Sequence, residues 1–232
     1  QLQRSDRLAA IGTLATGLAH EIRNPLGSIR GLAQLLAEDM KPEDPKTRYA
    51  QVIIKEIDRL NHVVQELLTF SQASSSGMEF NDINIALRDA LFIGKQSPKY
   101  KQNVKIVEQY DTQIPQVKIE KEKLIQAFLN IILNALEASG AAKNDDHTVE
   151  VRSTLGETRT HYPVPNLGFA IIEISNTGEP IPQEHLDHIF DPFFTTKETG
   201  TGLGLAIAHQ IIASHSGLIE VTSDKENGTI FQ

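Results

Sequence analysis

Apolar residues that alternate at intervals of three and four run through the first third of this 232-residue chain. This spacing produces a narrow apolar seam along a helix, the pattern of coiled coils and four-helix bundles. Between two such runs, the stretch "EDMKPEDPKT" holds two prolines and several acids, which indicates a turn. The pattern predicts a helical hairpin, with helices at about residues 5–38 and 46–73. The seam residues are Leu8, Ile11, Ala15, Leu18, Ile22, Pro25, Ile29, Leu32 and Leu36, then Ile53, Ile57, Leu60, Val64 and Leu67.

A hairpin that buries one seam on each helix still leaves apolar surface uncovered. The economical solution is a dimer in which two hairpins form a four-helix bundle. We therefore expect a homodimer through the N-terminal helices.

The stretch "LAHEIRNPL" places a histidine within the first helical run. His20 precedes Ile22 by two positions, about 200° around the helix, and is therefore predicted to point away from the bundle core. Asn24 shares the face of His20, and Glu21 flanks it. Pro25 lacks an N–H and should kink the helix within a turn of the histidine. A lone helical histidine is more often packed or solvated than reactive, so the local pattern leaves both interpretations open.

Composition narrows the classes of function. The net charge of -8 argues against sequence-independent nucleic-acid binding, which needs clustered Lys and Arg. No apolar run approaches the roughly 20 residues that cross a bilayer, and no signal peptide is evident. The chain has no cysteine, which fits a reducing cytosol. We expect a cytoplasmic fragment that contacts neither nucleic acid nor membrane; a membrane anchor elsewhere in the full-length protein stays open.

After "ASSSG", a predicted flexible linker, the rhythm of the sequence changes. Strand-like alternation occurs in "NVKIVEQY", "TVEVRSTL" and "GFAIIEIS", whereas "EKEKLIQAFLNIILNALEAS" and "GLGLAIAHQIIASHSG" are helical. Strands mixed with helices, without regular βαβ repetition, predict helices packed on one face of a mixed sheet. The end of the chain predicts a hairpin whose last strand is cut off at Gln232. The predicted domains are residues 1–73 and 78–232, joined by a linker at 74–77.

Two asparagines, Asn130 and Asn134, lie four residues apart in a helical run, so their amides project from one face. Neutral amides in an apolar helix reduce stability unless they bind something. A Mg²⁺ ion held near phosphates is one candidate, because Mg²⁺ takes oxygen ligands and keeps waters. An interhelical hydrogen bond or a solvent-facing pair explains the spacing equally well.

Glycines alternate in "GTGLGLAIAH", at Gly200, Gly202 and Gly204, before another helical run. Glycine lets backbone N–H groups approach an anion closely, and the helix N-terminus adds a favourable dipole. The pattern matches neither a Walker nor a Rossmann motif, so alone it is a weak indication of phosphate binding. Lys197 is close enough in sequence to reach phosphate oxygens.

Taken in order, these motifs resemble those of the sensor histidine kinases of two-component signalling. "HEIRNPL" resembles the phosphoacceptor box, "NIILNALEAS" the asparagine box, "NTGEPIP" the first glycine box, "DPFFTTK" the phenylalanine box, "GTGLGLAIAH" the second glycine box and "GTIF" the last box. The resemblance covers essentially the whole chain and is strongest to the nitrogen-regulation and sporulation-type kinases. It implies a dimeric four-helix bundle followed by a two-layer α/β sandwich, the ATP-binding domain of the GHKL or Bergerat type.

The resemblance also implies roles for individual residues. His20 is the implied phosphorylated nucleophile, Glu21 its acid/base partner, and Asn24 the residue that orients water during dephosphorylation of the partner. Asn134, with Asn130 nearby, is the implied Mg²⁺ ligand. The other residues implied in ATP binding are Asn176, Gly178, Ile181, Lys197, Gly200, Thr201, Gly202, Leu203, Gly204 and Thr229.

The implied activity is autophosphorylation of His20 by ATP, followed by transfer to an aspartate in the receiver domain of a response regulator. The same chain would also act as a phosphatase of that partner, and regulatory proteins could bind the helical stalk. The residues suit this chemistry, because phosphoryl transfer needs mainly positioning and charge neutralisation. A histidine is largely neutral near pH 7, and a carboxylate that takes its other ring proton makes it a better nucleophile.

Three positions depart from the family's motifs. Asn176 stands where an aspartate usually accepts a hydrogen bond from the adenine amino group, and Pro180 stands where a second glycine is usual. Asparagine keeps a carbonyl acceptor but loses the charge, so we expect adenine binding to survive. Glu137 replaces a lysine or arginine of some members, which makes Lys197 the expected cationic phosphate contact.

Three other interpretations stay open. One is a hydrolysing ATPase with the same nucleotide-binding fold, against which the pair His20 and Glu21 argues. Another is a phosphatase-biased or inactive dimeric scaffold, which Asn176 and Pro180 favour. The last is a coiled-coil adaptor fused to an α+β domain, which the ordered motifs make improbable.

Overall fold

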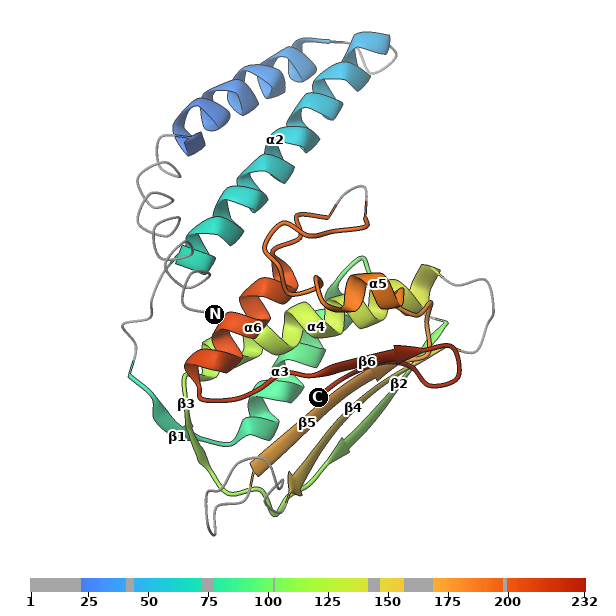
Figure 1. Ribbon diagram of the computed structural model, residues 1–232. Coiled ribbons are helices and arrows are strands. Elements are labelled where there is room, and N and C mark those ends of the chain that lie inside the picture. The colour runs from blue at the N-terminus through green and yellow to red at the C-terminus, as the bar shows by residue number, and fades with distance from the viewer. Residues whose placement is uncertain are drawn as a thin grey trace. The chain divides into compact units, whose positions relative to one another are not determined.

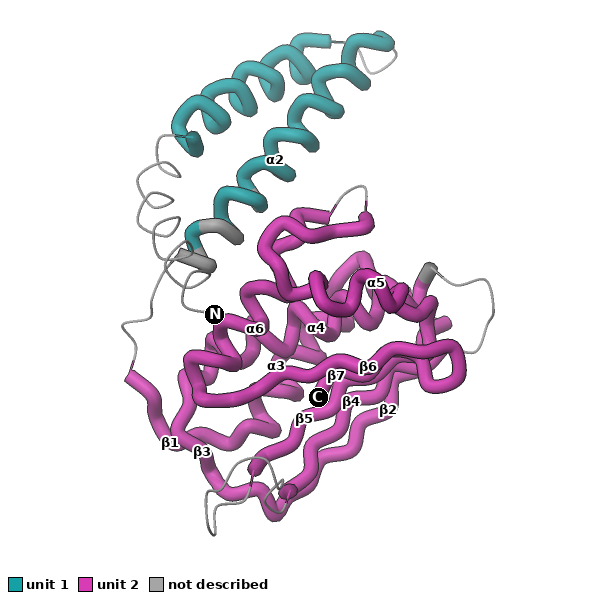
Figure 2. Tube along the Cα trace, in the orientation of Figure 1, with its two compact units in different colours: residues 1–74 teal, residues 75–232 magenta. Residues whose placement is uncertain are grey.

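The computed structural model describes residues 22–40, 44–71, 77–101, 103–141, 147–156, 169–197 and 200–232. The chain divides into two compact units, residues 1–74 and 75–232 (Figure 2). His20, Glu21 and most of the predicted linker lie outside the described residues. Within the described ranges, no helix is both long enough and apolar enough to cross a membrane.

The first unit is a helical hairpin, as predicted. Its first helix is described from residue 22 to 39, and α2 spans Pro45–Ser71 (Figure 1). The carboxylate of Asp44 accepts a hydrogen bond from the backbone N–H of Lys46 at 2.9 Å and so caps the start of α2. Pro45 follows the cap, where a missing N–H is harmless.

The contact between the two helices is made by small and branched side chains. Leu26 and Ala33 of the first helix are buried, and so are four residues of α2. An ion pair between Arg30 and Asp58, with Nε and Oδ1 2.7 Å apart, links the helices beside this contact. The four buried α2 residues are Ala50, Ile57, Val64 and Leu68.

The prediction that the seam is buried between the two helices of one hairpin is wrong for most of the described seam residues. Ile57 and Val64 are buried, but seven other seam residues are exposed on the hairpin surface. Each helix carries two apolar stripes, and intervals of three and four do not say which stripe faces the neighbouring helix. Ala33 and Ala50 on the inner stripe allow close approach of the helices. The seven exposed seam residues are Ile22, Pro25, Ile29, Leu32, Leu36, Ile53 and Leu60.

The second unit contains a five-stranded mixed sheet with the order β2-β4-β5-β7-β6. Strands β2 and β4 pair in parallel and the other neighbours are antiparallel, which confirms the predicted mixed sheet. The bounds are β2 (Val104–Tyr110), β4 (His147–Gly156), β5 (Phe169–Asn176), β6 (Val221–Asp224) and β7 (Gly228–Phe231).

Three helices cover one face of this sheet: α3 (Ile83–Gln96), α4 (Lys121–Ala141) and α6 (Gly204–Ser214) (Figure 1). Helix α4 contacts both other helices as well as β2, β4 and β5, so it is the centre of the helical layer. Its apolar side is buried, including Phe128, Ile132 and Leu136. On the sheet, Val149, Val151 and Ile174 complete the core. The result is the expected two-layer α/β architecture.

Four elements have no counterpart in the sequence analysis. Strands β1 (Glu79–Asn81) and β3 (Val117–Ile119) pair with each other, and α5 (Gln183–Leu186) is a single turn. These are too short to show periodicity. Helix α3 carries a readable signal, since the Asp82 side chain caps it by accepting a hydrogen bond from the Asn84 N–H.

Candidate functional site

The exposed side of α4 carries three polar residues, Asn130, Asn134 and Glu137. Their spacing of four and three places them on one helical face, because a turn takes about 3.6 residues. All three are half-buried, whereas Ile131, Ile132, Ala135 and Leu136 between them are buried. The face is therefore polar at its surface and anchored by apolar neighbours in the core.

Lys197 contacts two of these residues. Its Nζ donates hydrogen bonds to Asn134 Oδ1 at 2.9 Å and to Glu137 Oε2 at 2.8 Å. The Nζ of Lys99 donates to the same Glu137 oxygen at 2.9 Å. Burial raises the pKa of Glu137, but the hydrogen bonds from the two lysines outweigh it and hold this pKa below its usual value. The carboxylate is thus ionised at neutral pH and shared by two ammonium groups.

Lys197 belongs to the loop between α5 and α6, described at residues 187–197 and 200–203. The N–H of Phe193 donates to the carbonyl oxygen of Gly202 at 3.0 Å and draws the two ends of this loop together. Gly202 has a φ of +70°, and a Cβ there would lie 2.4 Å from the carbonyl carbon of Phe193. At Gly200 a Cβ would lie 2.5 Å from Thr195 Oγ1. Glycine at position 202 is therefore a steric requirement of the loop, whereas at position 200 the close atom belongs to a side chain.

Gly204 has a different role, as the first residue of α6. Its carbonyl oxygen accepts a hydrogen bond from Asn130 Nδ2 at 2.9 Å, which ties α6 to α4. A Cβ at Gly204 would make only an ordinary contact, 3.7 Å from Asn130 Cγ. Between loop and helix, Leu203 is fully buried, and its N–H donates to Thr201 Oγ1 at 3.3 Å.

A buried asparagine lies at the end of the middle strand of the sheet. Asn176 is only 3% exposed and its Nδ2 has no hydrogen-bond partner within the described part of the chain. It stands opposite Thr229 in the register of β5 and β7. Two residues on, a Cβ at Gly178 would lie 2.5 Å from the backbone of Ala138 in α4. A buried amide without a partner is rare in folded proteins and is explained when a ligand or water completes it.

The β6–β7 hairpin is joined to the loop after β5 by a chain of hydrogen bonds. The N–H of Ile181 donates to Ser223 Oγ at 2.8 Å, and Ser223 Oγ lies 2.7 Å from Thr229 Oγ1.

The structure brings three pairs of predicted site residues together: Asn134 with Lys197, Asn130 with Gly204, and Asn176 with Thr229. Asn24 is exposed on the first unit.

Two residues of the candidate site, Glu137 and Ser223, are not among the residues predicted from the sequence. Glu137 enters the sequence analysis only as a departure from a motif, although its spacing from Asn134 and its charge opposite to that of Lys197 both indicate a contact. Ser223 pairs with Thr229 across the β6–β7 hairpin, and the short turn between the strands fixes that register.

Among the described residues, no group of three or more His, Asp or Glu side chains could hold a metal ion by itself. A cation at Asn134 would therefore take further oxygens from a ligand and from water. Mg²⁺ is commonly bound in this way in phosphate-binding sites.

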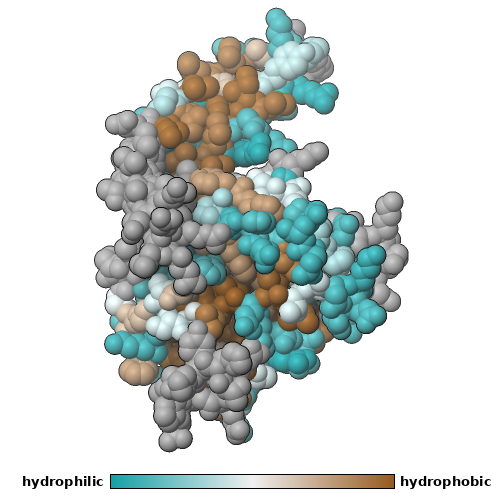
Figure 3. Space-filling view, in the orientation of Figure 1, coloured by the Kyte–Doolittle hydropathy of each residue, from teal (hydrophilic) through white to brown (hydrophobic). Residues whose placement is uncertain are grey.

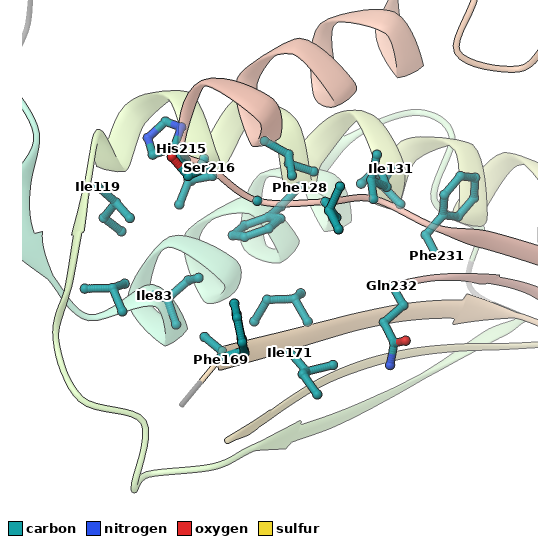
Figure 4. A pocket seen from close by; sticks show the side chains of 18 of the residues that line it. Ile83, Ile119, Phe128, Ile131, Phe169, Ile171, His215, Ser216, Phe231 and Gln232 are labelled. Atoms are coloured by element: carbon teal, nitrogen blue, oxygen red, sulfur yellow. The ribbon is translucent and has the colours of Figure 1, made fainter. Parts of the chain in front are cut away.

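An apolar pocket of about 340 Å³ lies between the helices and the sheet, near the start of β5 (Figure 4). Phe128 of α4, Phe169 and Ile171 of β5, and His215 lie around it (Figure 4). None of the predicted site residues lines this pocket, and Asn176 is at the other end of β5. The candidate site is therefore the polar cluster and not this pocket.

The chain matches two family models in succession. Residues 10–76 match the His Kinase A (phospho-acceptor) domain. Residues 119–232 match the Histidine kinase-, DNA gyrase B-, and HSP90-like ATPase family, which spans α4, the loop before α6 and the β6–β7 hairpin.

Curated relatives match over nearly the whole chain. Sensor histidine kinase ZraS of Escherichia coli (strain K12) is 36% identical over 231 residues, which cover 100% of this chain and 46% of the relative. Sensory histidine kinase/phosphatase NtrB of Klebsiella oxytoca is 36% identical over 225 residues, 96% of this chain and 61% of the relative. The chain thus spans about half the length of these relatives.

Solved structures show the same fold. Full-length ShkA in complex with AMPPNP has a TM-score of 0.73 at 24% identity, with 94% of this chain and 44% of that chain covered. The catalytic domain of histidine kinase ThkA has a TM-score of 0.52 at 29% identity, with 66% of this chain and 93% of that chain covered. The predicted fold class, a helical hairpin followed by a two-layer α/β domain, is confirmed.

Proposed function

This chain belongs to the sensor histidine kinases of two-component signalling, and from that premise we propose that it phosphorylates itself on His20 with ATP and passes the phosphoryl group to an aspartate of a response regulator. One observation carries the proposal: a phosphoacceptor family and an ATPase family match the chain in succession, and the second includes the polar face of α4 and the glycine loop. We place this reaction in the cytoplasm, where ATP and response regulators are available.

In the second unit, the residues at the end of β5 suit the purine side of the nucleotide. The carbonyl oxygen of Asn176 would accept a hydrogen bond from the adenine amino group, and its unpartnered Nδ2 would gain an acceptor on the ring. Gly178 keeps the turn close to α4, since any side chain there would meet backbone. Ile181 and Thr229, both joined to Ser223, would complete this side of the site.

The polar face of α4 and the loop before α6 suit the phosphate side. Asn134 Oδ1 would serve as the protein ligand of Mg²⁺, which when bound neutralises charge on the phosphates. Asn130 holds the start of α6 in place through Gly204. The loop residues proposed to surround the phosphates are Lys197, Gly200, Thr201, Gly202, Leu203 and Gly204.

In the first unit, the neutral His20 imidazole would attack the γ-phosphorus. An N–P bond forms, the bond from the γ-phosphorus to the bridging oxygen breaks, and ADP leaves. Glu21 would accept the proton from the other ring nitrogen, which keeps the nucleophile from carrying a full positive charge. Asn24 would orient water for a second activity, hydrolysis of the phosphorylated partner. The name of the relative NtrB, a histidine kinase/phosphatase, includes this activity.

The exposed apolar stripe of the first unit supports a homodimer. Ile29, Leu32 and Leu36 are between 48% and 63% exposed, and Ile53 and Leu60 of α2 extend the same kind of surface. Figure 3 shows hydrophobic side chains gathered on these helices. A second hairpin would cover them and form a four-helix bundle.

Labelling with ATP that carries radioactive γ-phosphate tests the proposal. The wild-type protein with Mg²⁺ should acquire an acid-labile, alkali-stable label, and His20→Gln should lose it while still binding nucleotide. Release of free phosphate without labelled protein would identify an ATPase instead. If neither labelled protein nor free phosphate were detected, the chain would be an inactive scaffold.

A further inference from the structure

Two oxygens on α4 converge on one ammonium group. Asn134 Oδ1 and Glu137 Oε2 lie 2.9 Å and 2.8 Å from Lys197 Nζ. The two residues are three apart on the helix, so their side chains reach the same point outside it. A lysine ammonium has three donors and no acceptor, and here it fills a small site built from oxygen atoms.

We propose that these two oxygens form a cation site that Lys197 occupies when no nucleotide is bound, and that the cation of the Mg²⁺–nucleotide complex displaces Lys197 from it. The inference rests on the proposed function, which assigns Asn134 to the metal. The oxygen of Asn134 cannot serve both cations at once, because a divalent ion and an ammonium that share it would lie within a few ångströms and repel each other. Lys197 is then free to turn to the phosphate oxygens.

Glu137 is the residue that keeps Lys197 in place. A carbonyl oxygen alone holds an ammonium weakly, whereas the carboxylate adds charge to the contact. The side chains of Glu137 and Lys197 are 33% and 40% exposed, so this ion pair is weak enough for a ligand to break. Lys99, which shares the Glu137 oxygen, leaves a second positive charge beside the site once Lys197 has moved.

The displacement would be transmitted to the loop. The N–H of Lys197 donates to Thr195 Oγ1 at 3.1 Å, and its carbonyl oxygen accepts from the Gly200 N–H at 3.2 Å. The lysine is thus built into the turn that leads to Gly202. Holding its side chain on α4 fastens the loop to the helix, and releasing it frees the loop to rearrange around a ligand. In this arrangement Glu137 is a positioning residue.

Hydrogen exchange of the nucleotide-free protein tests directly whether the contact of Lys197 with Asn134 and Glu137 holds the loop on α4. Glu137→Gln keeps the size of the side chain but removes its charge, and Lys197→Met removes the donor. Each should speed amide exchange in the loop at residues 194–197 and 200–203 by about 2- to 5-fold, as expected for loss of an exposed ion pair. The double variant should exchange no faster than Lys197→Met alone, because that change already removes the bonds of Lys197 to both Asn134 and Glu137.

Glu108→Gln is the matched control. Glu108 lies on β2, its carboxylate has a similar exposure, and it pairs with Lys95 of α3 at 2.7 Å. The variant therefore makes the same change in net charge without touching the loop. Loop exchange in this variant should equal that of the wild type. Equal loop exchange in Glu137→Gln and wild type would overturn the proposal that Glu137 holds Lys197 in place.

Binding of the non-hydrolysable analogue AMPPNP with Mg²⁺ tests the displacement. Glu137→Gln should tighten binding by about 2- to 5-fold in the wild-type background, and the gain should disappear in the Lys197→Met background. Weaker binding in both backgrounds would make Glu137 a direct ligand and overturn the proposal. A wild-type protein that binds no AMPPNP would contradict the proposed function. The exchange measurement is made without nucleotide, so it would still decide whether Glu137 holds Lys197 and the loop on α4.

Discussion

The side-chain amide of Asn130 donates a hydrogen bond to the carbonyl oxygen of Gly204 across 2.9 Å, which joins the middle of α4 to the first residue of α6. The two asparagines of the α4 face therefore differ in their partners. Asn130 contacts the backbone of another helix, whereas Asn134 contacts the side chain of a loop lysine. Asn130 is therefore a structural residue, whereas Asn134 is available to a ligand, although both lie on the same face of α4.

Asn130→Ala should destabilise the second unit, by about 1 kcal/mol for the lost hydrogen bond. Asn130→Asp should destabilise it more, because a carboxylate cannot donate and would face the carbonyl oxygen of Gly204. Urea unfolding measures both changes. Asn134→Ala is the control: it should leave stability within about 0.5 kcal/mol of wild type but weaken Mg²⁺-dependent nucleotide binding. Equal stability losses at the two positions would contradict the separation of roles.

The glycines of the loop should respond unequally to alanine. Gly202→Ala places a Cβ 2.4 Å from the backbone of Phe193 at a φ of +70°, so the loop must change its path. The unfavourable φ alone costs about 1–2 kcal/mol. Gly204→Ala meets no protein atom closer than 3.7 Å and should leave the stability nearly unchanged. Thermal unfolding compares the two variants, and similar losses of stability in both would show that the loop does not depend on Gly202.

Much of the fold could be predicted because its main elements are long and periodic. The alternation of apolar residues identified β2, β4 and β5, and the 3.6-residue period identified α4 and α6. Short elements could not be found in this way, since β1 and β3 gain stability only by pairing across about 40 residues of chain. The hairpin was recognised but its buried stripe was not. Periodicity reports that a helix has apolar faces, whereas the choice of partner for each face is made by packing.

The site was predictable in its residue types and less so in its contacts. The spacing of Asn130 and Asn134 was sufficient to place both on one helical face. The bond from Lys197 to Glu137 depends on the path of a loop 60 residues later, which no local pattern encodes. The positive φ of Gly202 is likewise a property of the closed loop, and glycine in the sequence only permits it.

The exposed stripe of the first unit predicts how the dimer can be broken. Leu32 is 63% exposed in the single chain, and a second hairpin would bury it. Leu32→Glu would then bury an unpaired carboxylate and should weaken the dimer by about 10-fold or more. Lys55→Glu, at an exposed position of α2, makes a larger change in charge outside the stripe and should leave the dimer intact. Analytical ultracentrifugation distinguishes the two. A dimer unaffected by Leu32→Glu would place the interface elsewhere.

Asp111 predicts how the stability of the second unit depends on pH. Its carboxylate accepts hydrogen bonds from the backbone N–H groups of Gln113 at 2.8 Å and Leu155 at 3.0 Å. These bonds favour the ionised form and hold the pKa of Asp111 below its usual value. A carboxyl group with a lowered pKa in the folded state contributes stability above its unfolded pKa of about 3.9, and this contribution is lost as the pH falls through the folded pKa.

Asp111→Asn removes that titration, because an amide keeps one acceptor and presents a donor to the second N–H group. The variant should be less stable than wild type near neutral pH, and the difference should shrink as the pH falls from about 5 to below the folded pKa. Urea unfolding at a series of pH values measures the difference directly. It should persist in about 1 M salt, since short hydrogen bonds to a fixed backbone are screened less than exposed charge pairs. Parallel stability curves for the two proteins would mean that Asp111 is ionised to the same extent in the folded and unfolded states, and that its bonds to Gln113 and Leu155 do not depend on its charge.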